Sequence, residues 1–151
     1  MSWFPLARDL MENEEFIKFF SPTEKLYTWL LISEYNFRGS SFYWADVEVA
    51  VTLGTSEKTV RRAREQLAKL GWVNYIPGTL DKKGRGLATK YLEVKWATPE
   101  DSSWFAQMHR HTFNMMLNCL RHKQFKPGDV VVYVYLSYWW WKCRGRYASM
   151  S

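Results

Sequence analysis

Cysteine is scarce in this chain. Of 151 residues only Cys119 and Cys143 are cysteine, and neither belongs to a CxxC pair or to the spaced set of a disulfide-rich secreted domain. We expect both to be reduced thiols. A zinc site that combines Cys119 with His109, His111 and His122 is disfavoured, because the spacing matches no finger or ribbon pattern. The sequence therefore predicts no metal ion and no cofactor.

The short motifs of common enzymes are missing. The chain has no GxxxxGK[ST] phosphate loop, no GxSxG nucleophile turn and no HExxH helix. His109 and His111 alternate where a helix is expected to start, and we interpret them as surface residues or polar contacts. We expect that the protein is not an enzyme.

Long apolar runs are also absent. Residues 130–141 form one of the longest, yet polar groups interrupt it and it is much shorter than the roughly 20 residues that a membrane span requires. The N-terminus lacks the basic and then apolar order of a secretory signal. We therefore expect no membrane partner and a cytoplasmic location.

Charge is sorted along the chain. Residues 1–56 hold four basic and eight acidic groups, residues 57–95 hold ten and four, and residues 96–151 hold seven and three. A polyanion would therefore meet the middle and last thirds, and the first third would face away from it or toward a protein. Hydrophobic residues make up 47% of the chain, which is ample for the packed core of one ordinary domain or two small ones.

The order of elements predicts a winged helix-turn-helix. Residues 3–20 favour a strand-like entry and a short helix, and Ser21-Pro22-Thr23-Glu24 starts a helix that reaches about Asn36. A second, short helix closes on Gly54, and Gly54-Thr55-Ser56 connects it tightly to a third over Glu57–Leu70. Strands are predicted over Trp72–Ile76 and Leu87–Trp96. The fold class is thus α+β, mostly helical with a β-hairpin wing over residues 1–97.

An internal echo follows a predicted linker at residues 98–103. Trp3-Phe4 recurs as Trp104-Phe105, Phe20-Ser21-Pro22 as Phe125-Lys126-Pro127, and Arg38-Gly39 as Arg144-Gly145. Residues 104–151 are therefore interpreted as the start of a second, incomplete winged-helix-like domain. Packing of this segment as an accessory to the first domain, truncation of the chain, and coincidence of two helix starts stay open.

The predicted helix over Glu57–Leu70 carries the strongest functional signal. Val60, Ala63, Leu67 and Leu70 share one side, and most of the charged residues lie opposite. A helix-turn-helix reads bases from the N-terminal part of this helix, where Arg and Lys bond guanine edges. The predicted base-reading residues are Lys58, Thr59, Arg61 and Arg62, with Ser56 at the helix start and Arg64 and Lys69 toward phosphate or solvent.

Two further features have alternative interpretations. Lys82, Lys83 and Arg85 lie at the predicted hairpin tip, where they would contact the phosphate backbone or the minor groove, or only aid solubility. Likewise, the charged side of the helix could be a solvated face with a pair between Arg61 and Glu65.

The aromatic run near the C-terminus cannot face a single core. Its residues are Tyr133, Tyr135, Tyr138, Trp139, Trp140 and Trp141. Consecutive tryptophans on a helix point through about 200°, so part of the run must be exposed or covered by a partner. Stacking on single-stranded bases with Lys142, Arg144 and Arg146, and burial against another part of the protein, are both compatible with the pattern.

Three stretches resemble a known family. They are Trp-Phe-Pro-Leu-Ala-Arg-Asp-Leu-Met at residues 3–11, Phe-Phe-Ser-Pro-Thr-Glu-Lys-Leu-Tyr at 19–27, and Leu-Gly-Thr-Ser-Glu-Lys-Thr-Val-Arg-Arg-Ala at 53–63. Over residues 3–96 the chain resembles the N-terminal winged helix of replication initiation proteins from plasmids, phages and mobile elements of Gram-positive bacteria, with DnaD-like and RepA-like initiators nearest. The resemblance implies binding to origin repeats in double-stranded DNA and contact with helicase-loading or other replication proteins.

These features together give one leading hypothesis and two rivals. The leading hypothesis is sequence-specific binding of duplex DNA in initiation of plasmid or mobile-element replication. A winged-helix transcriptional regulator, which would bind a palindrome as a homodimer, and a protein-interaction module of a replication complex are the alternatives.

Overall fold

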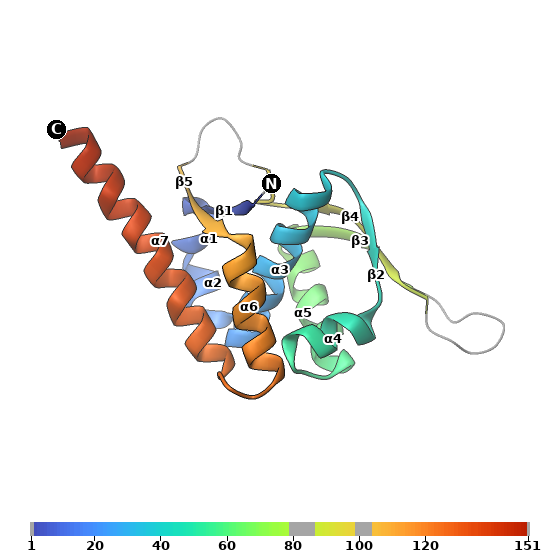
Figure 1. Ribbon diagram of the computed structural model, residues 1–151. Helices are drawn as coiled ribbons and strands as arrows, with labels where there is room; N and C mark the ends of the chain where they lie inside the picture. Colours follow the sequence, from blue (N-terminus) through green and yellow to red (C-terminus); the bar gives the residue numbers. More distant parts are fainter. Residues whose placement is uncertain (1, 79–86, 99–103, 151) are drawn as a thin grey trace.

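Helices and short strands are interspersed along the described chain. The computed structural model describes residues 2–78, 87–98 and 104–150, with the backbone alone for 145–150. Within this part the fold is α+β, because seven helices accompany two small antiparallel sheets (Figure 1). The elements are β1 (Trp3–Ala7), α1 (Arg8–Met11), α2 (Glu14–Phe19), α3 (Pro22–Arg38), β2 (Phe42–Trp44), α4 (Asp46–Leu53), α5 (Glu57–Lys69), β3 (Val73–Ile76), β4 (Thr89–Val94), β5 (Phe105–His109), α6 (Arg110–Arg121) and α7 (Pro127–Met150).

Helices α3 and α5 begin where side chains can cap them. The Glu24 N–H donates to Ser21 Oγ at 3.1 Å, and the Ser21 N–H donates to Glu24 Oε1 at 2.8 Å, which completes a capping box in front of Pro22. Ser56 caps α5 by accepting from the Thr59 N–H. The helix starts predicted at these two serines are therefore confirmed.

A three-stranded antiparallel sheet forms around β4. This strand pairs with β2 on one edge and with β3 on the other. Strands β3 and β4 confirm the two predicted strands in slightly shorter form. The sequence does not predict β2, because three aromatic residues directly before a helix are too few to show a period of two. Stacking of the Phe42 ring on the Tyr91 ring, 5.1 Å between centroids, holds β2 against β4.

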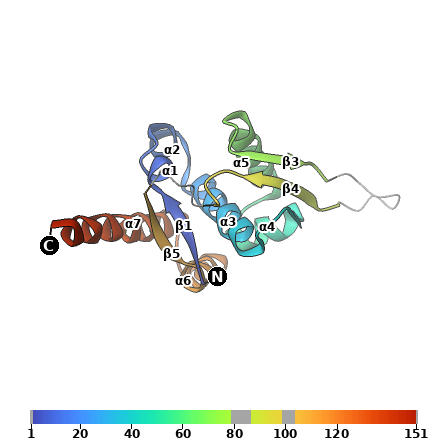
Figure 2. The ribbon, with the colours of Figure 1, turned by 90° about the horizontal axis from the view of Figure 1, so that it is seen from above.

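Two strands about 100 residues apart in the sequence form a second sheet. Strands β1 and β5 pair antiparallel, with Trp3 opposite His109 and Ala7 opposite Phe105. The two strands cross the molecule together between α7 and α6 (Figure 2). Helix α7 packs along α3, where the Trp29 and Tyr135 rings lie edge to face with their centroids 5.8 Å apart.

The internal echo has a structural counterpart. Each half of the chain runs from a strand through helical segments to a helix that begins with proline: β1, α1, α2 and α3 in one, β5, α6 and α7 in the other. At the start of α7 the Lys126 N–H donates to the Asp129 carboxylate at 2.9 Å, just as the Ser21 N–H donates to Glu24. The two helix starts therefore share a backbone contact as well as a sequence pattern.

Residues 104–141 pack on the first part of the chain. One continuous set of buried side chains includes Phe4 and Trp29 from the first part and Phe113 and Tyr138 from the second. The centroids of the Phe4 and Phe113 rings are 5.2 Å apart. The sequence left open whether this segment begins a second domain or packs as an accessory. In the described residues, the parts on either side of the linker predicted at 98–103 share one core.

Candidate nucleic-acid interface

Helix α5 separates apolar and charged side chains onto opposite sides. Val60, Ala63 and Leu67 are buried, as the 3.6-residue spacing predicts. The other side faces solvent along the length of the helix. Of the predicted site residues, Ser56, Lys58, Arg61, Arg62 and Lys69 are exposed and Thr59 is half-buried. The structure thus brings five of the predicted residues together at the N-terminal half of α5, with Lys69 near its other end.

The exposed cations of α5 do not pair with carboxylates in the described part of the chain. The ion pairs among described residues include none of Lys58, Arg61, Arg62 or Lys69. The pair between Arg61 and Glu65 that a solvated face would favour is not among them. Within the described residues these positive groups face solvent.

A tight connection presents the start of α5. Gly54 has φ of +65°, a left-handed conformation that costs glycine little, and the Thr55 N–H donates to the Ala50 carbonyl at 2.9 Å. Ser56 then accepts the Thr59 N–H at 3.2 Å. The amides of the first turn carry the positive end of the helix dipole, so this end of α5 favours an anion.

The structure contradicts the predicted exposure of Arg64. The sequence places it toward phosphate or solvent, but only 4% of Arg64 is exposed. Its Nη1 donates to Asp46 Oδ1 at 2.6 Å and its Nη2 donates to Asp46 Oδ2 at 3.0 Å. Its guanidinium also lies 5.0 Å from the centroid of the Tyr75 ring. The predicted DNA contact is therefore wrong for Arg64, because its charge is already bound inside the protein.

The buried network around Arg64 joins four elements. Arg64 Nη1 donates to the Tyr91 hydroxyl at 3.3 Å, and the Tyr91 hydroxyl lies 2.6 Å from that of Tyr27. The contacts link α3, α4, α5 and β4. Burial alone would lower the pKa of Arg64, but the hydrogen bond to Asp46 and its other partners raise it above its ordinary value. Arg64 is therefore a fixed cation that holds α5 against the sheet.

A signal in the sequence could have identified this role. Arg64 lies four residues after Val60 and three before Leu67, which is the spacing of the buried stripe of α5. A basic residue at such a position requires a buried acidic partner. Asp46 and Tyr91, which the sequence analysis missed, lie 18 and 27 residues away along the chain.

A hollow of about 270 Å³ lies between α5 and the base of the β3–β4 hairpin. Its lining comes from α5, from the start of α4 and from both arms of the hairpin: Ala45, Asp46, Val47, Glu57, Arg61, Arg64, Pro77, Gly78, Leu87 and Thr89. A Cβ at Gly78 would lie 1.8 Å from the Leu87 carbonyl oxygen, so only glycine fits where the two arms approach. The hollow makes the N-terminal half of α5 and the hairpin base adjacent surfaces.

The predicted hairpin tip lies outside the described residues. Lys82, Lys83 and Arg85 belong to residues 79–86, so the prediction for them stays a prediction. The loop ends of β3 and β4 point away from the body of the molecule, on the side opposite α1, α2 and α7 (Figure 1). Several acidic residues of the first third, among them Glu12, Glu14 and Glu15, lie in or next to α1 and α2, far from this end.

Metal sites, disulfides and membrane-spanning helices are absent from the described residues. In residues 2–78, 87–98 and 104–150, no group of three or more His, Cys, Asp or Glu side chains could hold a metal ion. Cys119 is half-buried and Cys143 is exposed, and neither forms a disulfide. No helix of the described chain combines the length and apolar character needed to cross a bilayer.

Comparisons with protein-family models, with curated proteins and with solved structures find no match to this chain. A function for this chain therefore has to be inferred from its own residues.

Proposed function

We propose that this chain is a winged-helix protein that binds double-stranded DNA through α5 and the β3–β4 hairpin. In this assignment α4 and α5 are the two helices of the helix-turn-helix, α5 enters the major groove, and the hairpin is the wing. The exposed cations at the N-terminal half of α5 carry the proposal, because Arg61 lines the hollow at the hairpin base and no ion pair among the described residues includes Lys58, Arg61 or Arg62.

The topology supports this assignment. From α3 onward the elements run helix, strand, helix, helix, strand, strand, and the three strands form one antiparallel sheet in the order β2, β4, β3. That order is the one expected for a winged helix. The buried contacts of Arg64 with Asp46 of α4 and with Tyr91 of β4 fix α5 on the sheet from which the hairpin extends. A rigid reading helix suits base recognition, since side chains must meet base edges in a defined register.

The proposed division of roles follows from position. Lys58, Arg61 and Arg62 read base edges with Thr59, and Ser56 contacts phosphate at the helix start. Lys69 lies eight residues after Arg61, roughly 12 Å along the axis, and contacts the phosphate backbone. Lys82, Lys83 and Arg85 contact the backbone or the minor groove from the hairpin tip.

The biological setting is initiation of plasmid or mobile-element replication. It rests on the resemblance of residues 3–96 to the N-terminal winged helix of replication initiators, which implies origin repeats as the DNA and helicase-loading proteins as partners.

The purified chain can be used to select DNA fragments from the plasmid or mobile element that encodes it. Sequencing of the selected fragments tests this function. We expect enrichment of short sites repeated near an origin. A single palindrome in a promoter would instead support a transcriptional regulator. Recovery of random fragments, or of none at any salt concentration, would contradict specific DNA binding.

A further inference from the structure

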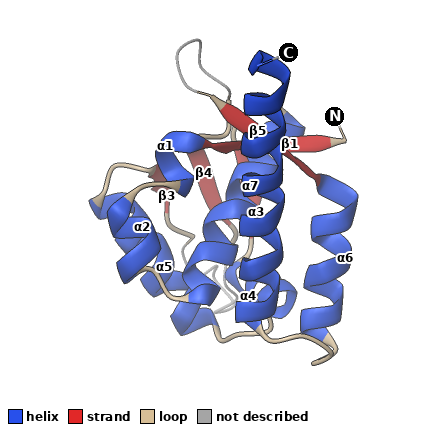
Figure 3. Ribbon diagram, turned by 90° about the vertical axis from the view of Figure 1, so that its left-hand side faces the viewer, coloured by secondary structure: helices blue, strands red, loops and turns tan. Residues whose placement is uncertain are grey.

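Helix α7 has an apolar face that nothing in the described chain covers. On its inner side Val130, Val134 and Tyr138 are buried against the rest of the molecule. On its outer side Val132 is 58%, Leu136 63% and Trp139 45% exposed. Figure 3 looks onto the side of the molecule that carries α7, and Figure 1 shows the helix at that edge. The outer face is therefore accessible over residues 132–140.

The spacing on this face is that of a coiled-coil seam. Asp129, Val132, Leu136, Trp139 and Cys143 follow one another at intervals of three, four, three and four residues. This repeat keeps a stripe in line along a helix that pairs with another helix. Tyr133 and Trp140, also about half exposed, flank the stripe. We call these seven residues the α7 seam.

We propose that the α7 seam pairs with the same seam of a second copy of this chain, with the two helices antiparallel and the two-fold axis at Leu136. The positions suit such a pair, because they are symmetric about Leu136. Val132 and Tyr133 precede it by four and three residues, and Trp139 and Trp140 follow it by three and four. Each end of the contact then combines a small and an aromatic side chain of one copy with two tryptophans of the other, which is the self-complementarity of a two-fold interface.

Charge favours the antiparallel orientation. A parallel pair would place Asp129 next to Asp129 of the second copy. In the antiparallel pair Asp129 instead lies near the end that carries Arg144, and the two helix dipoles oppose each other. The two Asp129 carboxylates are thereby separated, and each lies near an arginine.

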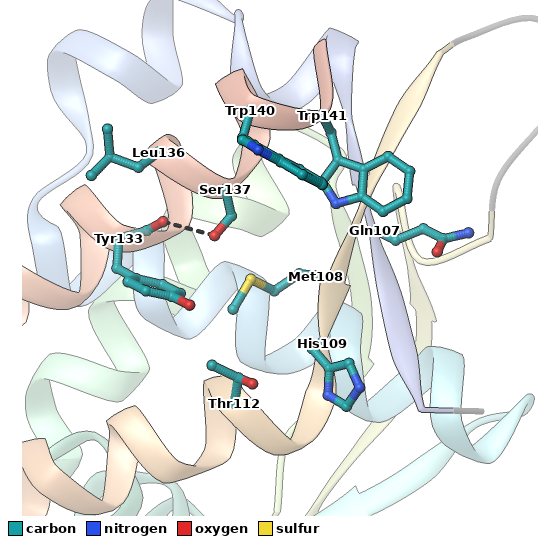
Figure 4. A pocket seen from close by; sticks show the side chains of 9 residues that line it. All are labelled: Gln107, Met108, His109, Thr112, Tyr133, Leu136, Ser137, Trp140 and Trp141. Atoms are coloured by element: carbon teal, nitrogen blue, oxygen red, sulfur yellow. Dashed lines mark hydrogen bonds between the residues drawn. The ribbon is translucent and has the colours of Figure 1, made fainter. Parts of the chain in front are cut away.

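A groove of about 390 Å³ borders the α7 seam. Figure 4 shows Tyr133, Leu136 and Trp140 of α7 on one side and Met108, His109 and Thr112 of β5 and α6 on the other. The groove lies on the flank of Tyr133 and Trp140. In the antiparallel pair this flank faces the same flank of the second copy, so that Trp140 of the second copy meets the mouth of the groove.

The exposed area is sufficient for a weak dimer. Aromatic side chains offer roughly 150–250 Å² each. Two copies of the five half-exposed apolar groups would therefore bury on the order of 1,000 Å², near the lower limit of a specific interface. We expect a dimer that dissociates on dilution.

Sedimentation equilibrium of the full chain tests the proposal. The wild type should associate from monomer to dimer as its concentration rises, and Leu136→Glu should remain monomeric because it places two carboxylates at the axis. Met115→Glu is the matched control, since Met115 is 56% exposed on the neighbouring helix α6. It should dimerise like the wild type. A wild type that stays monomeric at its highest soluble concentration, or a Leu136→Glu chain that still dimerises, would overturn the proposal.

Disulfide trapping tests the orientation without a destabilising charge. Under mild oxidation Leu136→Cys in a Cys143→Ser background should yield a covalent dimer, because the two thiols meet at the axis. The wild-type Cys143 should not cross-link, since the antiparallel pair separates its two copies by the length of the contact. Linkage through Cys143 would mean a parallel pair and would contradict the proposal.

Dimerisation through the α7 seam can be tested independently of DNA binding. Helix α7 and the hairpin base lie on opposite sides of the molecule (Figure 1), so Leu136→Glu should leave affinity for a single DNA site unchanged. Stacking on single-stranded bases is the competing use of the tryptophans. If the wild type stays monomeric and a single-stranded oligonucleotide quenches its tryptophan fluorescence, the tryptophans bind bases and the dimer proposal is wrong.

Discussion

Arg64 and Asp46 face each other across the contact between α5 and α4 and share two hydrogen bonds, of 2.6 and 3.0 Å. The side chain of Arg64 is 5% exposed and that of Asp46 16%. Removal of one member from such a pair leaves the other charge buried without compensation. The pair therefore ties the position of the proposed reading helix to the stability of the whole domain.

Loss of the acidic partner should be costly. Asp46→Ala should lower the free energy of unfolding by about 3 kcal/mol, because the guanidinium of Arg64 would remain buried without its counter-charge. Urea denaturation at neutral pH measures the change. Asp9→Ala is the matched control, since Asp9 pairs with Arg8 at 3.8 Å with both side chains about half exposed. It should cost less than about 0.5 kcal/mol.

The double variant isolates the pair itself. Asp46→Ala combined with Arg64→Met removes both charges and keeps an apolar side chain near Tyr75. It should cost clearly less than the sum of the two single variants. Strictly additive losses would show that the two residues do not act together, and would contradict the role given to them.

The contact between α7 and α1 should depend on pH. Glu12 follows α1 and accepts hydrogen bonds from Lys142 Nζ, at 2.7 and 2.8 Å, and from the Tyr138 hydroxyl. The Lys142 bond, and then the Tyr138 bond, lower the pKa of Glu12 below its ordinary 4.5. A carboxylate with a lowered pKa adds stability above its unfolded pKa and loses this contribution as the pH falls through the folded value.

Glu12→Gln should therefore flatten the acid limb of the stability curve. The wild type should lose stability more steeply than Glu12→Gln as the pH falls below about 4.5, as followed by urea midpoints across acidic buffers. Glu14→Gln controls for the loss of one charge, because Glu14 is 75% exposed and bonds only to Lys18 among the described residues. Parallel curves for the wild type and Glu12→Gln would show that Glu12 does not contribute to the loss of stability in acid.

A residue at the end of α6 offers a stabilising substitution. Lys123 has φ of +61°, and the Gln124 N–H beside it donates to the Cys119 carbonyl at 2.8 Å. This is the helix-ending position that favours glycine, because a Cβ in the left-handed region costs about 1 kcal/mol. Lys123→Gly should raise the melting temperature by a few degrees, equivalent to roughly 0.5–1 kcal/mol.

The control for this substitution keeps the Cβ. Lys123→Ala removes the same side chain and charge, so it should show no such gain. If alanine stabilised the protein as much as glycine, relief of electrostatic repulsion rather than of backbone strain would be the cause.

The sequence predicts the local features of this fold better than its long-range contacts. The start of α3 at Ser21 and that of α5 at Ser56 depend on side chains within one turn, and both are as predicted. The pairing of β1 with β5 joins residues about 100 positions apart. The repeat of Trp3-Phe4 at Trp104-Phe105 indicates related segments, but a repeat alone contains no information on whether its copies touch.

The same limit explains the error at Arg64. Its exposure depends on Asp46, which lies at the start of another helix, and on Tyr91 in a strand beyond the hairpin. Helical periodicity places Arg64 beside the buried stripe, but it does not identify the distant acidic residue that a buried arginine requires. Lys58, Arg61 and Arg62 lie opposite the stripe, and for them periodicity alone predicts the exposure that the structure has.

The most direct test compares two groups of cations in titrations of a selected DNA site and of random duplex across a range of salt concentrations. Arg61→Ala with Arg62→Ala should weaken specific binding by a few kcal/mol and non-specific binding much less, because each base contact contributes about 1–3 kcal/mol. Neutralising Lys82, Lys83 and Arg85 should weaken both and flatten the salt dependence. Equal losses on both DNAs for the two groups would contradict the assignment of α5 as the reading helix.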